Sequence, residues 1–254
     1  MIRVLYSGLR VHFLQLSRSS FEVVAMTFWP IVYATIAYYM FGAESDPAVL
    51  LTASLGATVM AIWSSVAFSA GGAIEIQRRL GTLELLVAAP VPFAAVLAPI
   101  TIAASAIGVY ALGATLLWGR LLFGIRLHFE HPVLFALSLP VAIAAIGMLG
   151  LVLASTLVYY RAALFLGASF DYPVWLITGL LVPLSVLPGW VAPISWLLAP
   201  TWGMRAIRES TVGGSPLGSI AMCIALSACY AAIALVCLRG FERLARERAT
   251  LALM

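Results

Sequence analysis

Long apolar stretches alternate with short polar ones along this chain. Six apolar stretches reach the length of about 20 residues that a helix needs to span a bilayer. They cover roughly residues 21–41, 49–72, 94–117, 133–157, 164–186 and 218–238. Prolines within several of them are tolerated, because neighbouring helices can satisfy the freed carbonyls. The pattern predicts an all-α integral membrane protein with six transmembrane helices, forming a single domain over residues 1–254.

The composition supports this prediction. Of the 254 residues, 63% are hydrophobic and 9% are charged, and the mean hydropathy is +1.08. Soluble domains contain about 45–50% apolar and about 25% charged residues. Cys223, Cys229 and Cys237 all fall in the last apolar stretch, which favours small buried side chains over a disulfide framework or a zinc site.

The first twenty residues, MIRVLYSGLRVHFLQLSRSS, have the pattern of an interfacial helix. Apolar residues recur at helical spacing, while Arg3, Arg10 and Arg18 can reach lipid headgroups. The apolar stretch that follows is too long for the core of a signal peptide, which is about 7–15 residues. We therefore expect residues 1–20 to lie on the membrane surface, although an inert anchor would show the same pattern.

The basic residues predict the orientation in the membrane, and all 14 of them are arginine. With the N-terminus inside, the inner segments hold Arg3, Arg10, Arg18, Arg78, Arg79, Arg161, Arg239, Arg243, Arg246 and Arg248. The outer loops hold Arg120, Arg126, Arg205 and Arg208. This distribution places both termini in the cytoplasm and explains most of the net charge of +4. A nucleic-acid-binding protein would need a clustered basic face on a soluble fold, and the sequence shows neither.

Residues 75–92, EIQRRLGTLELLVAAPVP, form a polar island between the second and third spans. Gly81 is expected to interrupt the helix that continues from the second span, and Thr82 can cap a new one. About two turns then place apolar residues on one face and Glu84 opposite, and Pro90 ends them. The residues of interest are Glu75, Arg78, Arg79, Gly81, Thr82, Leu83, Glu84, Leu86 and Pro90. A plain interfacial loop is the alternative to a short surface helix.

A second distinctive region, residues 181–214, precedes the last span. Its prolines and tryptophans alternate: Pro183, Pro188, Trp190, Pro193, Trp196, Pro200 and Trp202. Because an interior proline costs a helix about 3 kcal/mol, one continuous helix is excluded. Short broken helices that re-enter from the outer surface fit better, with residues 187–214 as the re-entrant segment and tryptophans at headgroup depth. Ordinary interface anchoring would explain many of the same residues.

Catalytic and metal-binding patterns are weak. A P-loop needs a lysine and the chain has none, so any ATP hydrolysis must come from another polypeptide. His128, Glu130 and His131 lie in an outer loop, but their spacing matches no strong metal template. Asp171 is the one acid expected inside a span, where an ionisable group usually marks a pathway or a partner. It is a candidate for contact with substrate, or else it sits at an interfacial kink before Pro173.

Taken together, the GTLELLVAAPVP run after the second span and the LPGWVAPISWLLAPTWGMRAIRE run before the last resemble the membrane subunit of ABC-2 type exporters. These permeases export drugs, lipids or glycans from bacteria. The resemblance implies that residues 75–92 are the coupling helix, which sits in a groove of a cytoplasmic ATPase subunit. It also implies that the 183–202 region gates the exit. A second permease chain, the same or related, would complete a dimer.

On this reading the chain binds no cofactor, since ATP and Mg are held by the partner ATPase, and it lies in the bacterial plasma (inner) membrane. The expected cargo is an amphipathic drug or a lipid-like molecule, with a cell-envelope glycan as the alternative. Two rivals come from other classes. An ion-coupled secondary transporter would use intramembrane acids and often inverted repeats. A membrane-embedded enzyme acting on a lipid would need a catalytic cluster that the sequence does not show.

Overall fold

The computed structural model describes residues 2–18, 28, 31–32, 35–36, 38–39, 47–82, 85–86, 91–124, 130–160, 163–180 and 187–248. All regular structure in these residues is helical, which confirms the all-α prediction. The helices are α1 (Ile2–Arg18), α3 (Pro47–Arg79), α5 (Ala94–Phe123), α6 (Pro132–Leu157), α7 (Ala163–Ser169), α8 (Asp171–Ile177), α9 (Val191–Trp196), α10 (Ala199–Val212) and α11 (Pro216–Arg248).

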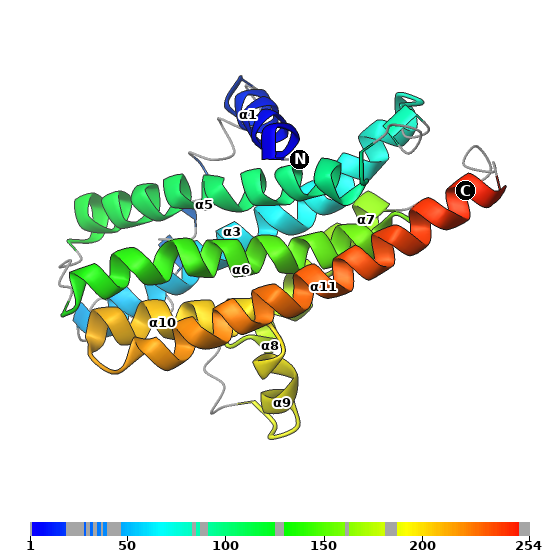
Figure 1. Ribbon diagram of the computed structural model, residues 1–254. Coiled ribbons are helices and arrows are strands. Elements are labelled where there is room, and N and C mark those ends of the chain that lie inside the picture. The colour runs from blue at the N-terminus through cyan, green and yellow to red at the C-terminus, as the bar shows by residue number, and fades with distance from the viewer. Residues whose placement is uncertain are drawn as a thin grey trace.

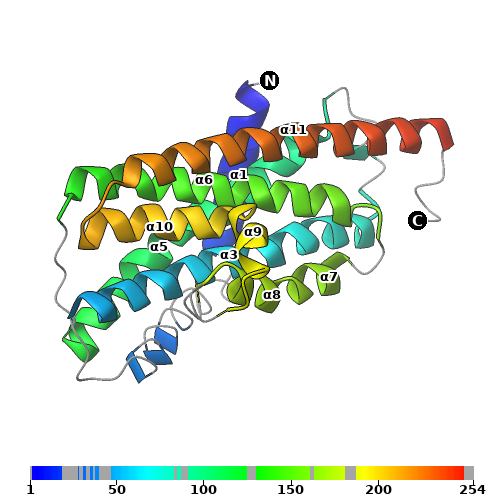
Figure 2. The ribbon, with the colours of Figure 1, turned by 90° about the horizontal axis from the view of Figure 1, so that it is seen from below.

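Four long helices, α3, α5, α6 and α11, form a bundle, with α10 packed against α3, α6 and α11 (Figures 1 and 2). We call one end of the bundle the Arg78 end; α3, α6 and α11 finish there and α5 begins there. At the opposite end, the Glu209 end, α5 and α10 finish and α6 and α11 begin. Helix α1 packs against α5 and runs across the direction of the long helices, an orientation that suits a helix lying on a membrane surface.

Among the described residues, three helices are long and apolar enough to cross a membrane: Leu50–Arg79, Pro132–Leu157 and Pro216–Leu244. Helix α5 is also long, with 30 residues, and contains the shorter apolar stretches Ala94–Ala106 and Leu112–Leu122. The predicted first span, 21–41, lies largely outside the described residues. The number of six spans therefore stays a prediction.

The predicted fifth span, 164–186, is not one helix in its described part. It divides into α7 and α8 at Phe170, because Pro173 has no N–H to donate to the preceding turn. The two pieces nevertheless run antiparallel to α3. A Cβ on Gly167 would lie 2.7 Å from the Ala67 carbonyl oxygen, and one on Gly56 would lie 3.3 Å from the Leu180 carbonyl oxygen.

Small residues allow the helices of the bundle to approach closely. A Cβ added to Gly150 of α6 would lie 2.1 Å from Val66 Cγ1 of α3. Nearby, a Cβ on Gly147 would lie 2.7 Å from the Ser105 hydroxyl of α5. Such contacts are typical of membrane proteins, where lipid competes equally for apolar side chains and close packing must hold the helices together.

Candidate functional site

Helix α3 ends at the polar island through a glycine-centred C-terminal turn. Gly81 has a φ of +66°, which side chains with a Cβ rarely adopt. The Gly81 N–H donates to the Arg78 carbonyl at 3.1 Å, and the Thr82 N–H donates to the Gln77 carbonyl at 3.0 Å. These two bonds are the Schellman pattern, which satisfies carbonyls that the helix end leaves open. The structure thus ends the helix where Gly81 predicted an interruption.

Thr82 begins the next turn, because the Leu86 N–H donates to the Thr82 carbonyl at 3.0 Å. The Thr82 hydroxyl also points back to Gln77, lying 2.5 Å from the Gln77 Oε1 and 3.3 Å from its carbonyl oxygen. The hydroxyl therefore closes the end of α3, a role that the sequence pattern did not distinguish from capping.

The described leucines of this segment divide between the bundle and the exterior. Leu86 packs against the cluster of buried residues around Phe93, whereas Leu80 and Leu85 are 68% and 70% exposed. The sequence pattern did not single out these two exposed leucines. The sequence did contain a sign of them, because the run LGTLELL holds more leucines than one buried face can accommodate. Leu83, Glu84 and Pro90, which it did single out, lie outside the described residues.

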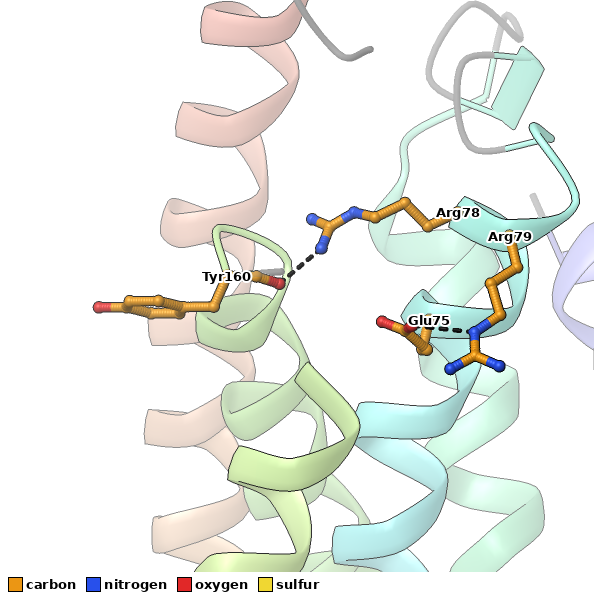
Figure 3. Close-up of polar contacts among 4 residues, drawn as sticks. All are labelled: Glu75, Arg78, Arg79 and Tyr160. Carbon is orange, nitrogen blue, oxygen red and sulfur yellow. Dashed lines mark hydrogen bonds and ion pairs between the residues drawn. The ribbon is translucent and has the colours of Figure 1, made fainter. Parts of the chain in front are cut away.

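The two arginines at the end of α3 behave differently (Figure 3). Arg78 reaches across to the end of α6, where Nη1 donates to the Tyr160 carbonyl at 2.5 Å and Nη2 to the Val158 carbonyl at 2.7 Å. A cation at a helix C-terminus also interacts favourably with the helix dipole. Arg79 pairs with Glu75 one turn earlier at 3.0 Å and is 74% exposed. An exposed pair of this kind contributes about 0.3–0.5 kcal/mol, so only Arg78 connects two helices firmly.

The proline- and tryptophan-rich region forms broken helices, as its prolines predicted. Pro188 and Trp190 precede α9, which contains Pro193, and Pro200 lies in the first turn of α10, where a missing N–H costs nothing. Pro183 lies outside the described residues.

The turn between α9 and α10, which together we call the α9–α10 hairpin, is bonded to a tryptophan and to α11. The Trp202 indole donates to the Trp196 carbonyl at 2.8 Å, and the Tyr230 hydroxyl donates to the Leu197 carbonyl. Tyr230 lies at the middle of the candidate span Pro216–Leu244, so the start of α10 lies beside the middle of α11. The headgroup depth of the tryptophans stays a prediction.

A polar chain holds α10 to α11 at the Glu209 end. Arg205 lies 5.5 Å from the Trp202 ring centroid, and its Nε donates to Glu209 Oε1 at 2.8 Å. The second oxygen of Glu209 accepts a bond from the Ser219 hydroxyl of α11 at 2.8 Å. Arg205 and Glu209, four residues apart on α10, thus form an ion pair, and Ser219 extends it to a second helix.

In the described structure, Glu130 and His131 contact the end of α10 through their backbone N–H groups. Their N–H groups donate to the carbonyls of Thr211 and Ser210, at 3.2 and 3.1 Å, and so satisfy the C-terminal end of α10. His128 lies outside the described residues, and within the described part of the chain no three His, Cys, Asp or Glu side chains gather in a way that could hold a metal ion.

Asp171 faces α3 near the middle of the candidate span Leu50–Arg79. Its Oδ1 lies 2.8 Å from the Ser64 hydroxyl, which is itself 2.9 Å from the Met60 carbonyl. A hydroxyl has one proton and can donate to only one of these acceptors at a time. The half-buried carboxyl group therefore lies beside the middle of α3, away from the Arg78 end of the bundle.

Comparison with known proteins addresses the class of the chain. A family model described as ABC-2 type transporter matches residues 3–212, from α1 to the end of α10. A comparison with curated proteins yields no match. The family match includes the end of α3, Asp171 and the α9–α10 hairpin, and it covers well over half of the 254 residues. The chain therefore belongs to the ABC-2 type transporter family, and it is a membrane permease of an ABC transporter.

Proposed function

We propose that this permease exports an amphipathic drug or lipid-like molecule, working as a dimer with a second permease and two cytoplasmic ATPase subunits. The family implies an ABC ATPase as partner. The observation that carries the proposal is the end of α3, where Gly81 turns the chain out of the bundle and leaves Leu80 and Leu85 exposed beside charged residues. An apolar surface with a charged rim is typical of a protein interface.

In this proposal the Arg78 end faces the cytoplasm, and the segment 75–92 is the coupling element. ATP and Mg are bound by the ATPase, and the permease itself breaks no covalent bond. It contributes by binding its partner and cargo differently in two global states. The α9–α10 hairpin, with Pro183, Pro188, Trp190, Pro193, Pro200 and Trp202, forms the outer gate. Asp171 lines the substrate pathway, where its carboxyl group favours a cationic amphipath.

The alternatives differ from this proposal in cargo or in energy source. A glycan exporter would use the same coupling segment, so only the cargo differs. An ion-coupled transporter would rely on Asp171 alone among the described membrane-depth acids, and its transport would persist without an ATPase but collapse with the proton gradient.

The test is affinity purification of the tagged permease from its native membrane, with co-purifying ATPases identified by their Walker A sequence. Wild-type permease should retain such an ATPase. Glu84→Arg should reduce its recovery about tenfold, because reversing one interface charge costs on the order of 1.4 kcal/mol. The matched control is Arg208→Glu, an exposed charge reversal near the Glu209 end, which should have no effect. Equal recovery with Glu84→Arg would show that the coupling assignment is wrong.

A further inference from the structure

Both sides of the segment 80–92 are attached to other helices of the bundle. On the entry side, Arg78 donates to the carbonyls of Val158 and Tyr160, just after the last residue of α6. On the exit side, the Phe93 N–H, at the start of α5, donates to the Glu242 carboxylate of α11. The two sides of the segment thus have one anchor on α6 and one on α11.

Aromatic side chains connect the two anchors with each other. The Phe241 ring lies 5.6 Å from the Phe93 ring and 5.5 Å from the Tyr159 ring, between centroids. Phe93 and Phe241 are 1% and 2% exposed, so this contact is part of the core. The Tyr159 hydroxyl donates to the Cys237 carbonyl of α11 at 3.1 Å. The ends of α6 and α11 are therefore held together independently of the segment.

The bonds of these groups match their chemistry. Arg78 supplies two donors in a planar fork to carbonyls that a helix end leaves open, and such charge-assisted bonds are stronger than neutral ones. Glu242 places a carboxylate at the N-terminus of α5, where free N–H groups and the helix dipole favour an anion. Burial raises the pKa of the Tyr159 phenol, and Cys237 adds to this in the same direction, so the hydroxyl keeps its proton and its donor role at neutral pH.

The turn at Gly81 borders open space, since a Cβ there would meet nothing within 4 Å. The packing of Leu86 against the buried cluster around Phe93 ties the segment to the bundle, and Arg78 and Glu242 add polar bonds to α6 and α11. With the anchors, a displacement of the segment must also move the ends of α6 and α11. Helix α10 packs against both of these helices, and a Cβ on Gly203 would lie 3.0 Å from the Ala142 Cβ of α6. The two anchored helices thus both contact the α9–α10 hairpin, as does α3.

We infer that Arg78 and Glu242 are positioning residues that make the segment 80–92 move with α6 and α11, so that motion at the Arg78 end reaches the α9–α10 hairpin through those two helices. Neither residue needs to touch the ATPase for this role. The inference rests on the proposed function, because it takes an ATPase to be what moves the segment.

The experiment uses the purified permease–ATPase complex in nanodiscs and follows hydrogen–deuterium exchange of residues 187–212, with and without trapping by ATP and orthovanadate. The loss variants are Arg78→Gln and Glu242→Ala, each made singly. The matched control is Arg239→Gln, which removes an exposed arginine of α11 near the same end of the bundle, outside the coupling segment 75–92. Glu242→Gln is the conservative variant, since its amide oxygen can still accept the Phe93 N–H.

In the wild type and in Arg239→Gln, trapping should change the exchange of residues 187–212. In Arg78→Gln and Glu242→Ala that response should be lost while the ATPase still co-purifies, and Glu242→Gln should retain part of it. A full response in both loss variants would overturn the inference. If a loss variant fails to elute as a folded monodisperse complex, Glu242→Gln decides, because an undiminished response there also contradicts the role of the carboxylate. Failure of any ATPase to co-purify with the wild type would instead refute the proposed function.

Discussion

The close approach of α6 to α3 at Gly150 provides a quantitative test of the packing. Alanine at this position would place its Cβ 2.1 Å from Val66 Cγ1, whereas carbon atoms in good contact lie about 3.5–4.0 Å apart. Val66 is fully buried, and a β-branched side chain in a helix has one strongly preferred rotamer, so it cannot turn aside. We expect Gly150→Ala to lower the free energy of unfolding by about 1–3 kcal/mol, the usual range for overpacking.

The companion change, Val66→Ala, removes the two methyl groups and leaves the Val66 Cβ 3.6 Å from the new Cβ, an ordinary contact. Alone it should cost about 2 kcal/mol, from about 0.8 kcal/mol per buried methyl group and a cavity contribution. In the double variant the methyl group added at position 150 occupies the space left by the Val66 methyl groups. The loss of unfolding free energy should therefore be about 1–3 kcal/mol smaller than the sum of the two single losses.

Unfolding of the purified permease in mixed detergent and SDS micelles, followed by circular dichroism, measures these differences. The control is Gly113→Ala in α5, where a Cβ would meet nothing within 4 Å. It should be neutral or stabilising by up to about 1 kcal/mol, because alanine is the better helix former. If Gly150→Ala were as stable as the wild type, or if Val66→Ala gave it no relief, the close contact between α3 and α6 would be refuted.

Two further predictions concern the end of α3 and the membrane-depth acid. Gly81→Ala should lower the free energy of unfolding by roughly 1–2 kcal/mol, because φ is +66° there, and should weaken ATPase co-purification. The control is Gly189→Ala, where a Cβ meets open space at an ordinary φ. Equal effects of the two changes would contradict the backbone argument. Asp171→Asn should reduce the stimulation of ATPase activity by cationic amphipaths about tenfold, the equivalent of about 1.4 kcal/mol, while sparing neutral ones. Unchanged stimulation across such a panel would mean that the Ser64–Asp171 bond is structural only.

Local features of the helices were predictable from the sequence. The predicted span 133–157 differs by one residue from α6, Pro132–Leu157, because Pro132 at the first helical position and a long apolar run define it. Gly81 predicted the end of α3, because a left-handed residue is needed to close a helix in this way. The division of 164–186 into α7 and α8 was less accessible, since other prolines, such as Pro99 in α5 and Pro140 in α6, lie inside continuous helices. Tertiary surroundings decide whether a proline breaks a helix or is accommodated.

The partners of the polar side chains were not predictable. Arg78 and Tyr160 are 82 residues apart, Ser64 and Asp171 are 107 apart, and Phe93 and Glu242 are 149 apart. A positive-inside arginine and an arginine that joins two helices look alike in the sequence, and Glu242 stands among arginines that suggest only a cytoplasmic helix end. No periodic pattern links positions so distant.

The sequence by itself determined the class of this protein: an all-helical membrane chain without a lysine for a P-loop, with a polar segment interrupted by glycine after a long apolar stretch. These properties follow from short stretches of sequence, because the length of an apolar run and the positions of glycine and proline act directly on the local backbone. Only the tertiary structure decided which helices touch and which polar groups meet. In a chain with 63% hydrophobic residues, lipid-facing and buried faces are built from the same side chains, so packing geometry alone distinguishes them.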